Sequence, residues 1–377
     1  MYQTDRILPA LLDGDQYTTE EAHQRDMTLL RDRAWQLVAT TEMLRGHGDF
    51  LAAERHGIPI LIRRHEDRFL AFHNVCAHRG CRLATGSGNS PELKCPYHGW
   101  CYGADGKTKK IPAAKENFPH FARDQHQLRM YPVRQVGTLL LVRLTPNGSE
   151  DEKDKDSIDD WCQWETVFAD ATSSERWRLV LNEELDYECD WKIPIEGSLE
   201  SYHLDEVHAA TFGGAPRETD CEHELKENGT IFSTQARGAS ILSRLESAAV
   251  RGITGQFDPS YRHVHLFPNV MATITDSLVL VYQIYPTARR RSRMTLFGWV
   301  PRSRRLGPIG SYIGWWLGVF ASRMARRVLA EDAAIFTEVQ AGLDAAISDR
   351  VFGRSEERLH SFHQHWRSVT AESVDLQ

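Results

Sequence analysis

The sequence contains no internal repeat, no glycine-rich nucleotide-binding loop and no flavin-binding signature. We therefore expect no fused module that binds a nucleotide or flavin cofactor. An excess of positive charge is also absent, because the net charge is −7, which argues against a general nucleic-acid-binding protein. At 377 residues, with 41% hydrophobic residues and 10 tryptophans, the chain is long enough for two domains with hydrophobic cores.

Long hydrophobic runs and a disulfide framework are missing as well. The longest apolar stretch, about residues 309–321, is too short to cross a bilayer. The N-terminal residues show no basic and apolar targeting signal. The seven cysteines are odd in number and lack the spacing of a disulfide-rich domain. We therefore expect no membrane segment and a reducing, cytoplasmic environment.

Two short cysteine–histidine motifs stand out. Cys76-x-His78 is followed, after 16 residues, by Cys95-x-x-His98. Each loop offers one thiolate and one imidazole, so two cysteines can bind one iron of a [2Fe–2S] cluster and two histidines the other. A Cys2His2 zinc site is the alternative, because it uses similar ligands. Zinc fingers usually place both cysteines in one loop and both histidines in the other, so the pattern favours the iron–sulfur cluster.

The loops Cys76-Ala77-His78-Arg79-Gly80 and Cys95-Pro96-Tyr97-His98-Gly99-Trp100 closely resemble the motif of Rieske proteins. The resemblance implies a [2Fe–2S] cluster held by Cys76, His78, Cys95 and His98. High-potential Rieske proteins of respiratory chains have a cysteine at the position of Cys81, which forms a disulfide with a second cysteine at the position of Tyr97. Because that partner is missing, the resemblance favours the lower-potential, oxygenase type, with Cys81 packed as a small apolar residue.

A second group of possible metal ligands lies between residues 189 and 213. His203 and His208 follow Glu200 by three and eight residues. On a straight helix Glu200 and His203 would share a face, whereas His208 would lie about 140° from His203. Both histidines can therefore bind one metal only if the helix ends or distorts between them. Two imidazoles and one downstream carboxylate would then form the facial triad of a non-heme Fe(II) site.

This segment resembles the catalytic-iron motif of Rieske non-heme iron oxygenases. In that family a Trp-Lys pair precedes an acid and two histidines, and the matching residues here are Trp191, Lys192, Glu200, His203 and His208. Most aromatic-ring dioxygenases have Asp at the position of Glu200, and Glu is more similar to the carnitine, choline and glycine-betaine monooxygenase branch. The family often has Asn where this chain has Gly197, so a hydrogen bond from that amide near the iron is not expected.

The third iron ligand is expected to be an acid far downstream. Residues 330–343 resemble the family's helix of the form Glu-Asp-x6–7-Gln-x-Gly-Leu, and this match assigns the role to Asp332, with Glu331 and Asp344 as fallbacks. The resemblance also implies that Glu200 bridges a cluster histidine of one chain to His203 of the next. Such a head-to-tail ring requires cyclic symmetry, and we expect a homotrimer.

The periodicity predicts an α+β protein. Residues 18–44 should form an amphipathic helix, capped near Thr18 and Thr19, that leads into a strand. Pro59 should begin its strand or lie at a sheet edge. In the first half, strands are expected at 58–62, 69–72 and 139–144. In the second half, an antiparallel meander is expected at 270–274, 278–285 and 294–300, and helices at 311–350 and 355–369.

Three parts are expected along the chain. Residues 1–35 should be a helical segment that packs on the catalytic domain, 36–147 a small antiparallel β domain that holds the cluster, and 148–377 a catalytic domain in which a curved antiparallel sheet grips long helices. The charged stretch 148–156 is expected to be a solvated linker or surface loop. The basic run 289–293 is expected to be a solvated hairpin turn, with a docking patch for an acidic electron donor as the alternative.

These resemblances imply the terminal oxygenase component of a Rieske non-heme iron system. A separate reductase, of flavin or ferredoxin type, would deliver electrons from NAD(P)H, and O2 would be activated at Fe(II) beside a small organic substrate. Glu200 favours monooxygenation, as hydroxylation or oxidative demethylation, and aromatic-ring cis-dihydroxylation is the alternative. In a different class, a Rieske-type electron carrier would need a much shorter chain and no site at His203 and His208.

Overall fold

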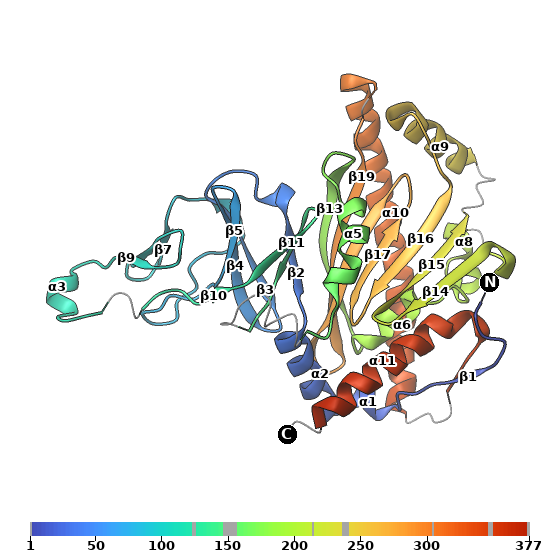
Figure 1. Cartoon of the computed structure of the whole chain (residues 1–377), viewed down its shortest axis with the longest axis horizontal. Coiled ribbons are helices and arrows are strands. Elements are labelled where there is room, and N and C mark those ends of the chain that lie inside the picture. The colour runs from blue at the N-terminus through green and yellow to red at the C-terminus, as the bar shows by residue number, and fades with distance from the viewer. Residues whose placement is uncertain are drawn as a thin grey trace. The chain divides into compact units, whose positions relative to one another are not determined.

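The structure is a computed structural model that describes residues 2–122, 126–145, 157–212, 215–235, 241–303, 305–345 and 350–374. The chain divides into two compact units, one formed by Met1–Thr28 with Ile158–Gln377 and the other by Leu29–Ser157. Both combine helices with antiparallel strands (Figure 1), so the predicted α+β class is confirmed. The predicted linker at 148–156 lies outside the described residues, and the domain boundaries drawn from the sequence stay predictions.

The smaller unit contains three antiparallel sheets, with strand orders β10-β5-β4-β3-β6, β11-β12-β2 and β7-β8-β9. Its strands are β2 (Gln36–Thr40), β3 (Asp49–Arg55), β4 (Ile58–His65), β5 (Arg68–His73), β6 (Ser87–Asn89), β7 (Leu93–Lys94), β8 (Cys101–Tyr102), β9 (Thr108–Lys110), β10 (Met130–Tyr131), β11 (Val133–Val136) and β12 (Leu139–Val142). One short helix, α3, spans Ala114–Asn117, and a 3-10 turn spans Thr41–Met43.

The predicted strands of this unit are present, because β4, β5 and β12 cover the three expected segments. Pro59 is the second residue of β4, near the start of a strand that lies inside its sheet. The hairpin between β3 and β4 turns at His56 and Gly57, which both have positive φ, as a two-residue turn requires. The apolar residues of these strands form one buried cluster that includes Val38, Ile60, Ile62, Leu140 and Val142.

The larger unit is built on a seven-stranded antiparallel sheet with the order β13-β19-β18-β17-β16-β15-β14. Its strands are β13 (Trp177–Tyr187), β14 (Cys221–Lys226), β15 (Gly229–Gln235), β16 (Ser260–Leu266), β17 (Val270–Ile274), β18 (Val279–Ala288) and β19 (Arg291–Pro301), with a separate two-stranded ribbon of β1 (Leu8–Pro9) and β20 (Val351–Phe352). From β14 to β19 each strand pairs with the next along the chain, so the predicted meander is confirmed.

The helices of this unit include two long ones, α10 (Gly307–Asp344) and α11 (Glu357–Val374), which were predicted with slightly different ends. The others are α1 (Asp15–Thr18), α2 (Glu20–Arg33), α5 (Trp161–Ala171), α6 (Lys192–Ser198), α7 (Leu204–Val207), α8 (Ala209–Phe212) and α9 (Ile241–Thr254), with 3-10 turns at Glu218–Asp220 and Arg354–Glu356. The α2 cap is confirmed, because the Thr19 hydroxyl accepts a hydrogen bond from the Ala22 amide at 3.3 Å. The prediction of a helix over 18–44 is wrong in its second part, because α2 ends at Arg33 and the buried, apolar segment that follows forms β2.

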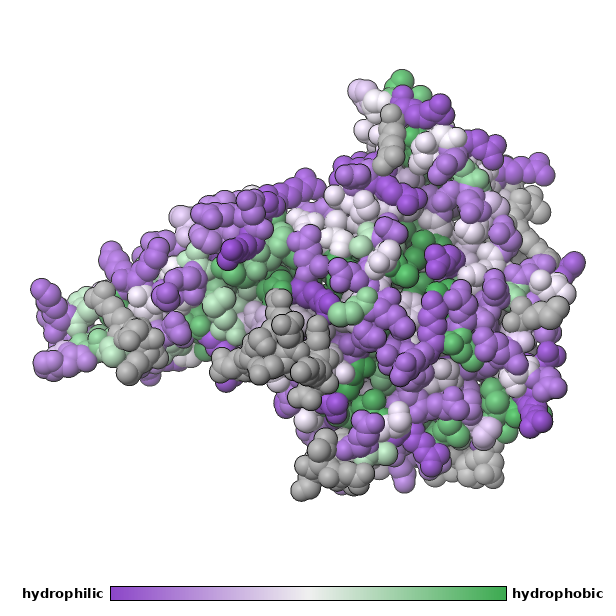
Figure 2. All heavy atoms as spheres, in the orientation of Figure 1, coloured by the Kyte–Doolittle hydropathy of each residue, from purple (hydrophilic) through white to green (hydrophobic). Residues whose placement is uncertain are grey.

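Among the described residues, no helix is both long enough and apolar enough to cross a membrane. On the face shown in Figure 2, hydrophobic areas are small and lie between hydrophilic ones. The basic run 289–293 forms the turn between β18 and β19, as predicted. Two of its arginines pair with acids of the same unit, Arg290 with Asp344 at 3.0 Å and Arg293 with Asp186 at 2.6 Å, and the electron-donor docking alternative stays a prediction.

A buried charge cluster anchors the segment that precedes the two histidines. The Lys192 ammonium lies 2.6 Å from Asp26 of α2 and 2.8 Å from Asp190. The Trp191 indole N–H donates to the same Asp26 carboxylate at 3.0 Å. Because a buried charge is stable only when it is paired, this cluster holds α6 against α2 and explains why a Trp-Lys pair stands before the histidine motif.

Candidate metal centres

The first candidate centre is built from two loops of similar shape in the smaller unit. In the first loop the Cys76 amide donates to Cys81 at 2.8 Å and the Gly80 amide donates to Cys76 at 3.0 Å. In the second, the Cys95 amide donates to Trp100 at 2.8 Å and the Gly99 amide donates to Cys95 at 3.0 Å. Gly80 and Gly99 both have φ near +70°, a conformation that favours glycine. The local sequence therefore folds each Cys/His motif around the same tight turn.

The four predicted cluster ligands lie on these loops with suitable burial. Cys76 and Cys95 are only 3% and 2% exposed, whereas His98 lies at the surface. The ring centroids of His78 and His98 are 4.7 Å apart. The Nδ1 atom of His78 is buried and has no hydrogen-bond partner among the described residues. An orphaned imidazole nitrogen beside two buried thiols is what a cluster iron requires.

Burial is the main cause that raises the pKa of the Cys76 thiol. A thiolate at this position therefore needs compensation, which bound iron supplies. The Tyr102 hydroxyl accepts a hydrogen bond from the Ala77 amide at 3.0 Å and lies 3.0 Å from the Cys76 sulfur, so its proton is free to point at the sulfur. Tyr102 was not singled out from the sequence, although its place two residues after Trp100 on a short strand was a usable signal.

Aromatic rings cover this centre. Trp100 stacks on His78 with ring centroids 4.9 Å apart and an interplanar angle of 4°. Phe118 packs edge-on against both of these rings. Cys81 is a free thiol that packs beside the same buried side chains, and Tyr97 is 58% exposed. The position of Cys81 therefore agrees with the prediction that it packs without a disulfide.

The second candidate centre lies where a helix is interrupted. α6 ends at Ser198 and α7 begins at Leu204, so His203 precedes α7 and His208 follows it. The turn α7 ends at Val207, so a helix ends between the two histidines, as the spacing required, whereas the longer interruption precedes His203. His203 Nε2 lies 3.7 Å, and His208 Nε2 lies 2.8 Å, from the Asp332 carboxylate on α10. The ligand atoms of all three residues lie within 4.8 Å of one another.

Two further carboxylates bind the Nδ1 atoms of the two imidazole rings, on the side away from Asp332. Glu200 accepts from Nδ1 of His203, and Glu331 accepts from Nδ1 of His208 at 2.8 Å. Both rings are therefore held in the tautomer that leaves Nε2 free for a metal. Burial and the Glu200 hydrogen bond act in opposite directions on the pKa of His203, and the net result is a raised pKa. Burial also raises the pKa of Asp332, which a bound cation would offset.

The three acids that the sequence offered as possible third ligands, Asp332, Glu331 and Asp344, have different surroundings in the structure. Asp332 faces both histidines. Glu331 lies behind His208, where it also accepts from Thr211 at 3.1 Å and from Arg327 at 3.0 Å. Asp344 lies at the end of α10 and accepts from Gln340 at 3.1 Å. This arrangement supports Asp332 as the third ligand and gives Glu331 a positioning role that the sequence did not reveal.

Gly197 brings α6 close to α10. A Cβ atom at this position would come within 2.5 Å of the Phe336 ring, so a larger residue cannot fit without a shift. Phe336 follows Asp332 by about one helical turn on α10. This chain has Gly197 where the family often has Asn. The space that a side chain at this position would need is filled by the ring of Phe336, which lies on the same helix as the candidate ligand Asp332.

Glu331→Gln should weaken Fe(II) binding by about 10- to 100-fold without unfolding the protein. Glutamine keeps an oxygen that can accept from His208. It loses the negative charge that strengthens the hydrogen bonds donated by Arg327 and by the imidazole N–H. Competition with an Fe(II) chelator measures the affinity. Glu338→Gln, an exposed acid on the same helix, is the control and should leave it unchanged. Equal affinities of the Glu331 variant and the native protein would contradict the positioning role.

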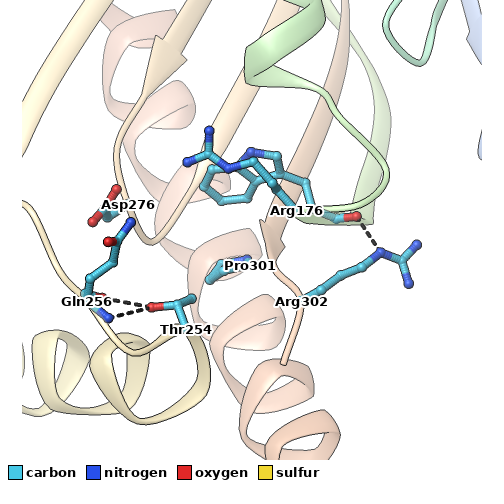
Figure 3. A pocket seen from close by; sticks show the side chains of 7 residues that line it. Arg176, Thr254, Gln256, Asp276, Pro301 and Arg302 are labelled. Atoms are coloured by element: carbon cyan, nitrogen blue, oxygen red, sulfur yellow. Dashed lines mark hydrogen bonds between the residues drawn. The ribbon is translucent and has the colours of Figure 1, made fainter. Parts of the chain in front are cut away.

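A separate pocket lies where β13 begins and β19 ends (Figure 3). It is lined by Arg176, Trp177, Thr254, Gln256, Asp276, Pro301 and Arg302. Pro301 lies beside Gly314 of α10, and Asp332 follows Gly314 by 18 residues, or about 27 Å of helix. This pocket is therefore remote from the candidate iron ligands.

Comparisons with known proteins agree with this arrangement. Residues 34–132 match the Rieske [2Fe-2S] domain, and residues 174–372 match the catalytic domain of the ring hydroxylating alpha subunit. The glycine betaine monooxygenase oxygenase subunit of Pseudomonas aeruginosa is 28% identical over 194 residues, which are 51% of this chain and 43% of that protein. The carnitine monooxygenase oxygenase subunit of Escherichia coli is 23% identical over 271 residues, which are 71% of this chain and 68% of that protein.

The fold has solved counterparts. The crystal structure of the quaternary ammonium Rieske monooxygenase CntA in complex with an inhibitor superposes with a TM-score of 0.74 at 18% identity, covering 95% of this chain and 94% of the other. The matched region of the Pseudomonas relative is less than half of that protein's length. The two matched ranges span the positions of the eight residues that were predicted to bind or bridge the two metal centres, and those assignments stay predictions. The residues are Cys76, His78, Cys95, His98, Glu200, His203, His208 and Asp332.

Proposed function

The chain belongs to the ring-hydroxylating alpha subunit family, and from this premise we propose that it acts as the terminal oxygenase of a Rieske non-heme iron system. A Rieske [2Fe-2S] domain precedes the catalytic domain in the same chain. The observation that carries the proposal is the convergence of His203, His208 and Asp332, because an electron carrier has no use for a second metal site.

The residues fit both metal groups. Cys76, His78, Cys95 and His98 would hold the [2Fe–2S] cluster, and His203, His208 and Asp332 would hold Fe(II). When bound, the cluster supplies single electrons and the Fe(II) supplies the place where O2 is activated. Glu200 and Glu331 orient the two imidazole rings through their Nδ1 atoms. Burial of His208 and the aromatic rings of Tyr187 and Phe336 keep water away from this side of the site.

The reaction that fits best is monooxygenation of a small organic substrate, as C-hydroxylation or as oxidative demethylation through a hydroxylated methyl group. Glutamate at position 200 and the names of the relatives from Pseudomonas and Escherichia, glycine betaine and carnitine monooxygenase oxygenase subunits, support it. Aromatic-ring cis-dihydroxylation is the second candidate, which the ring-hydroxylating description of the family favours.

The partners follow from the same proposal. Electrons would come from NAD(P)H through a separate reductase of flavin or ferredoxin type. The functional assembly would be a homotrimer, in which Glu200 bridges a cluster histidine of a neighbouring copy to His203. Support comes from one structural counterpart, a quaternary ammonium Rieske monooxygenase whose structure is described as giving insight into inter-subunit electron transfer. Seven free cysteines fit a reducing cytoplasm.

Turnover under 18O2 tests the proposal. The purified protein, loaded with iron and supplied with a reductase and NADH, is incubated with candidate substrates, and the products are analysed by mass spectrometry. One labelled oxygen is expected in the product of C-hydroxylation, and two would indicate dihydroxylation. Oxidative demethylation would instead release the label in formaldehyde, which is trapped before its oxygen exchanges with water, and would leave an unlabelled demethylated product. A protein that accepts and donates electrons but holds no third iron and incorporates no label from any candidate would be an electron carrier.

A further inference from the structure

The first half of α10 presents large apolar side chains to solvent. Of the fourteen large hydrophobic residues that are exposed among those the structure describes, six lie between Leu306 and Phe320 and are 41–68% exposed. Hydrophobic residues scattered singly over a surface are normal, whereas a group of them marks a surface that another body covers. We call this group the aromatic face, and its members are Leu306, Ile309, Tyr312, Trp315, Trp316 and Phe320.

The aromatic face is continuous along the helix. Its members at positions 309, 312, 316 and 320 follow one another at intervals of three, four and four residues. This spacing places them on one side of α10 over about 16 Å. The ring centroids of Trp315 and Trp316 are 5.0 Å apart, and that of Tyr312 lies 6.2 and 6.3 Å from them. The side chains therefore form one strip rather than separate exposed residues.

Three glycines fix the outward direction of this strip. Gly310, Gly314 and Gly318 are buried and lie about one turn apart on the opposite side of α10. A Cβ atom at Gly318 would come within 2.9 Å of Val180 on β13, and one at Gly310 would collide with the Ser303 side chain. The inner side of the helix therefore has no room for larger residues, so α10 cannot rotate to bury the aromatic face.

The charge around the aromatic face is positive, although the charge of the whole chain is negative. Residues 302–330 contain six arginines and no acidic residue, whereas the net charge of the chain is −7. Arg305 precedes the aromatic face and Arg323 follows it, and both are exposed. Among the described residues, no ion pair reaches either of them. Arg323 follows Phe320 by three residues, so it lies on the same side of the helix.

An anionic membrane surface matches both the composition and the charge. Tryptophan and tyrosine rings are favoured at the level of the lipid headgroups, and arginines are attracted to anionic lipids. The N-terminal end of α10 projects beyond the end of the sheet beside α9 (Figure 1), so it can reach a flat surface. The apolar run at 309–321 is too short to cross a bilayer, so the helix would lie along the interface.

A protein partner fits the aromatic face less well. Tryptophan, tyrosine and arginine are also common at protein interfaces, and the proposed function implies two partners, a second copy and an electron donor. Both would act near the metal centres. Trp316, however, precedes Asp332 by 16 residues, or about 24 Å of helix. The aromatic face therefore lies away from the candidate iron site.

We propose that the aromatic face, with Arg305 and Arg323 at its ends, binds the surface of a membrane rich in anionic phospholipids. The apolar side chains would enter the headgroup layer while the two guanidinium groups pair with phosphates. This attachment is separate from oxygenation, and it would hold the catalytic unit at a membrane without a spanning segment.

Co-sedimentation of the holoenzyme with vesicles tests the proposal. The vesicles contain equal parts of phosphatidylglycerol and phosphatidylcholine, or phosphatidylcholine alone. The anionic vesicles should bind the protein at least about tenfold more tightly than the neutral ones, and added salt should remove most of this difference. The double variant Tyr312→Ser/Trp316→Ser should lower the affinity for anionic vesicles by about tenfold or more. Arg323→Gln should lower it by about fivefold.

Controls separate the aromatic face from the rest of the surface. Ile7→Ser and Arg291→Gln change exposed side chains elsewhere and should bind as the native protein does. Cluster absorbance and iron content show whether each variant is folded. The proposal is wrong if the native protein does not bind anionic vesicles, or if the double variant binds them equally well. Self-association that the double variant loses, without vesicle binding, would overturn it in favour of a contact between copies. The measurement needs no turnover, so failure of the oxygenase function would not affect it.

Discussion

Asp332→Ala should remove the mononuclear iron and abolish oxygenation while the [2Fe–2S] cluster keeps its absorbance and its EPR signal. The Asp332 carboxylate lies 3.7 and 2.8 Å from the Nε2 atoms of His203 and His208, whose ring centroids are 5.2 Å apart. Two imidazoles alone are a poor Fe(II) site, because the facial triad needs a hard anionic oxygen as well. Iron analysis should show a loss of about one iron per chain, measured against acid-labile sulfide, which counts the cluster separately.

The matched control for this variant is Asp344→Ala. Asp344 lies on the same helix and was a fallback ligand, but its contacts are Gln340 and Arg290. Its removal should leave iron content and turnover near those of the native protein. If the Asp344 variant loses the iron and the Asp332 variant retains it, the assignment of the third ligand is wrong.

Glu200→Gln should leave the iron and the cluster in place but slow the single-turnover oxidation of the reduced protein by about 10- to 100-fold. Glu200 bonds to Nδ1 of His203, on the side of the ring away from Asp332, so it does not occupy a ligand position. A carboxylate can accept charge-assisted hydrogen bonds from two imidazole N–H groups. Glutamine keeps one acceptor oxygen, loses the charge and adds donors that neither ring can use.

Stopped-flow absorbance of the reduced cluster, with substrate and O2, measures this effect, and light scattering checks that the variant has the same oligomeric state as the native protein. Iron loss in the glutamine variant would make Glu200 a ligand rather than a bridge. Cluster oxidation at the native rate would exclude the bridging role. Glu206→Gln, an exposed acid six residues further along, is a suitable control.

Much of this architecture could be predicted from local sequence patterns. The alternation of apolar residues predicted the β17–β19 meander, and the spacing of His203 and His208 required a helix to end between them, as α7 does at Val207. It was harder to predict which acid of α10 is the ligand. Glu331 and Asp332 are adjacent in the sequence, and only tertiary contacts decide which of them faces the histidines. The positioning role of Glu331 gave no local signal at all, since its partner His208 is 123 residues away.

The contact between Gly197 and Phe336 also limits how this family can vary. A Cβ atom at position 197 would lie 2.5 Å from the Phe336 ring, and overpacking at such a contact is destabilising. A homologue that has asparagine at the position of Gly197 should therefore have a smaller side chain at the position of Phe336. The two positions should co-vary across an alignment, although they are 139 residues apart in the chain. Co-variation of positions 197 and 336 would indicate that natural selection maintains the distance between α6 and α10.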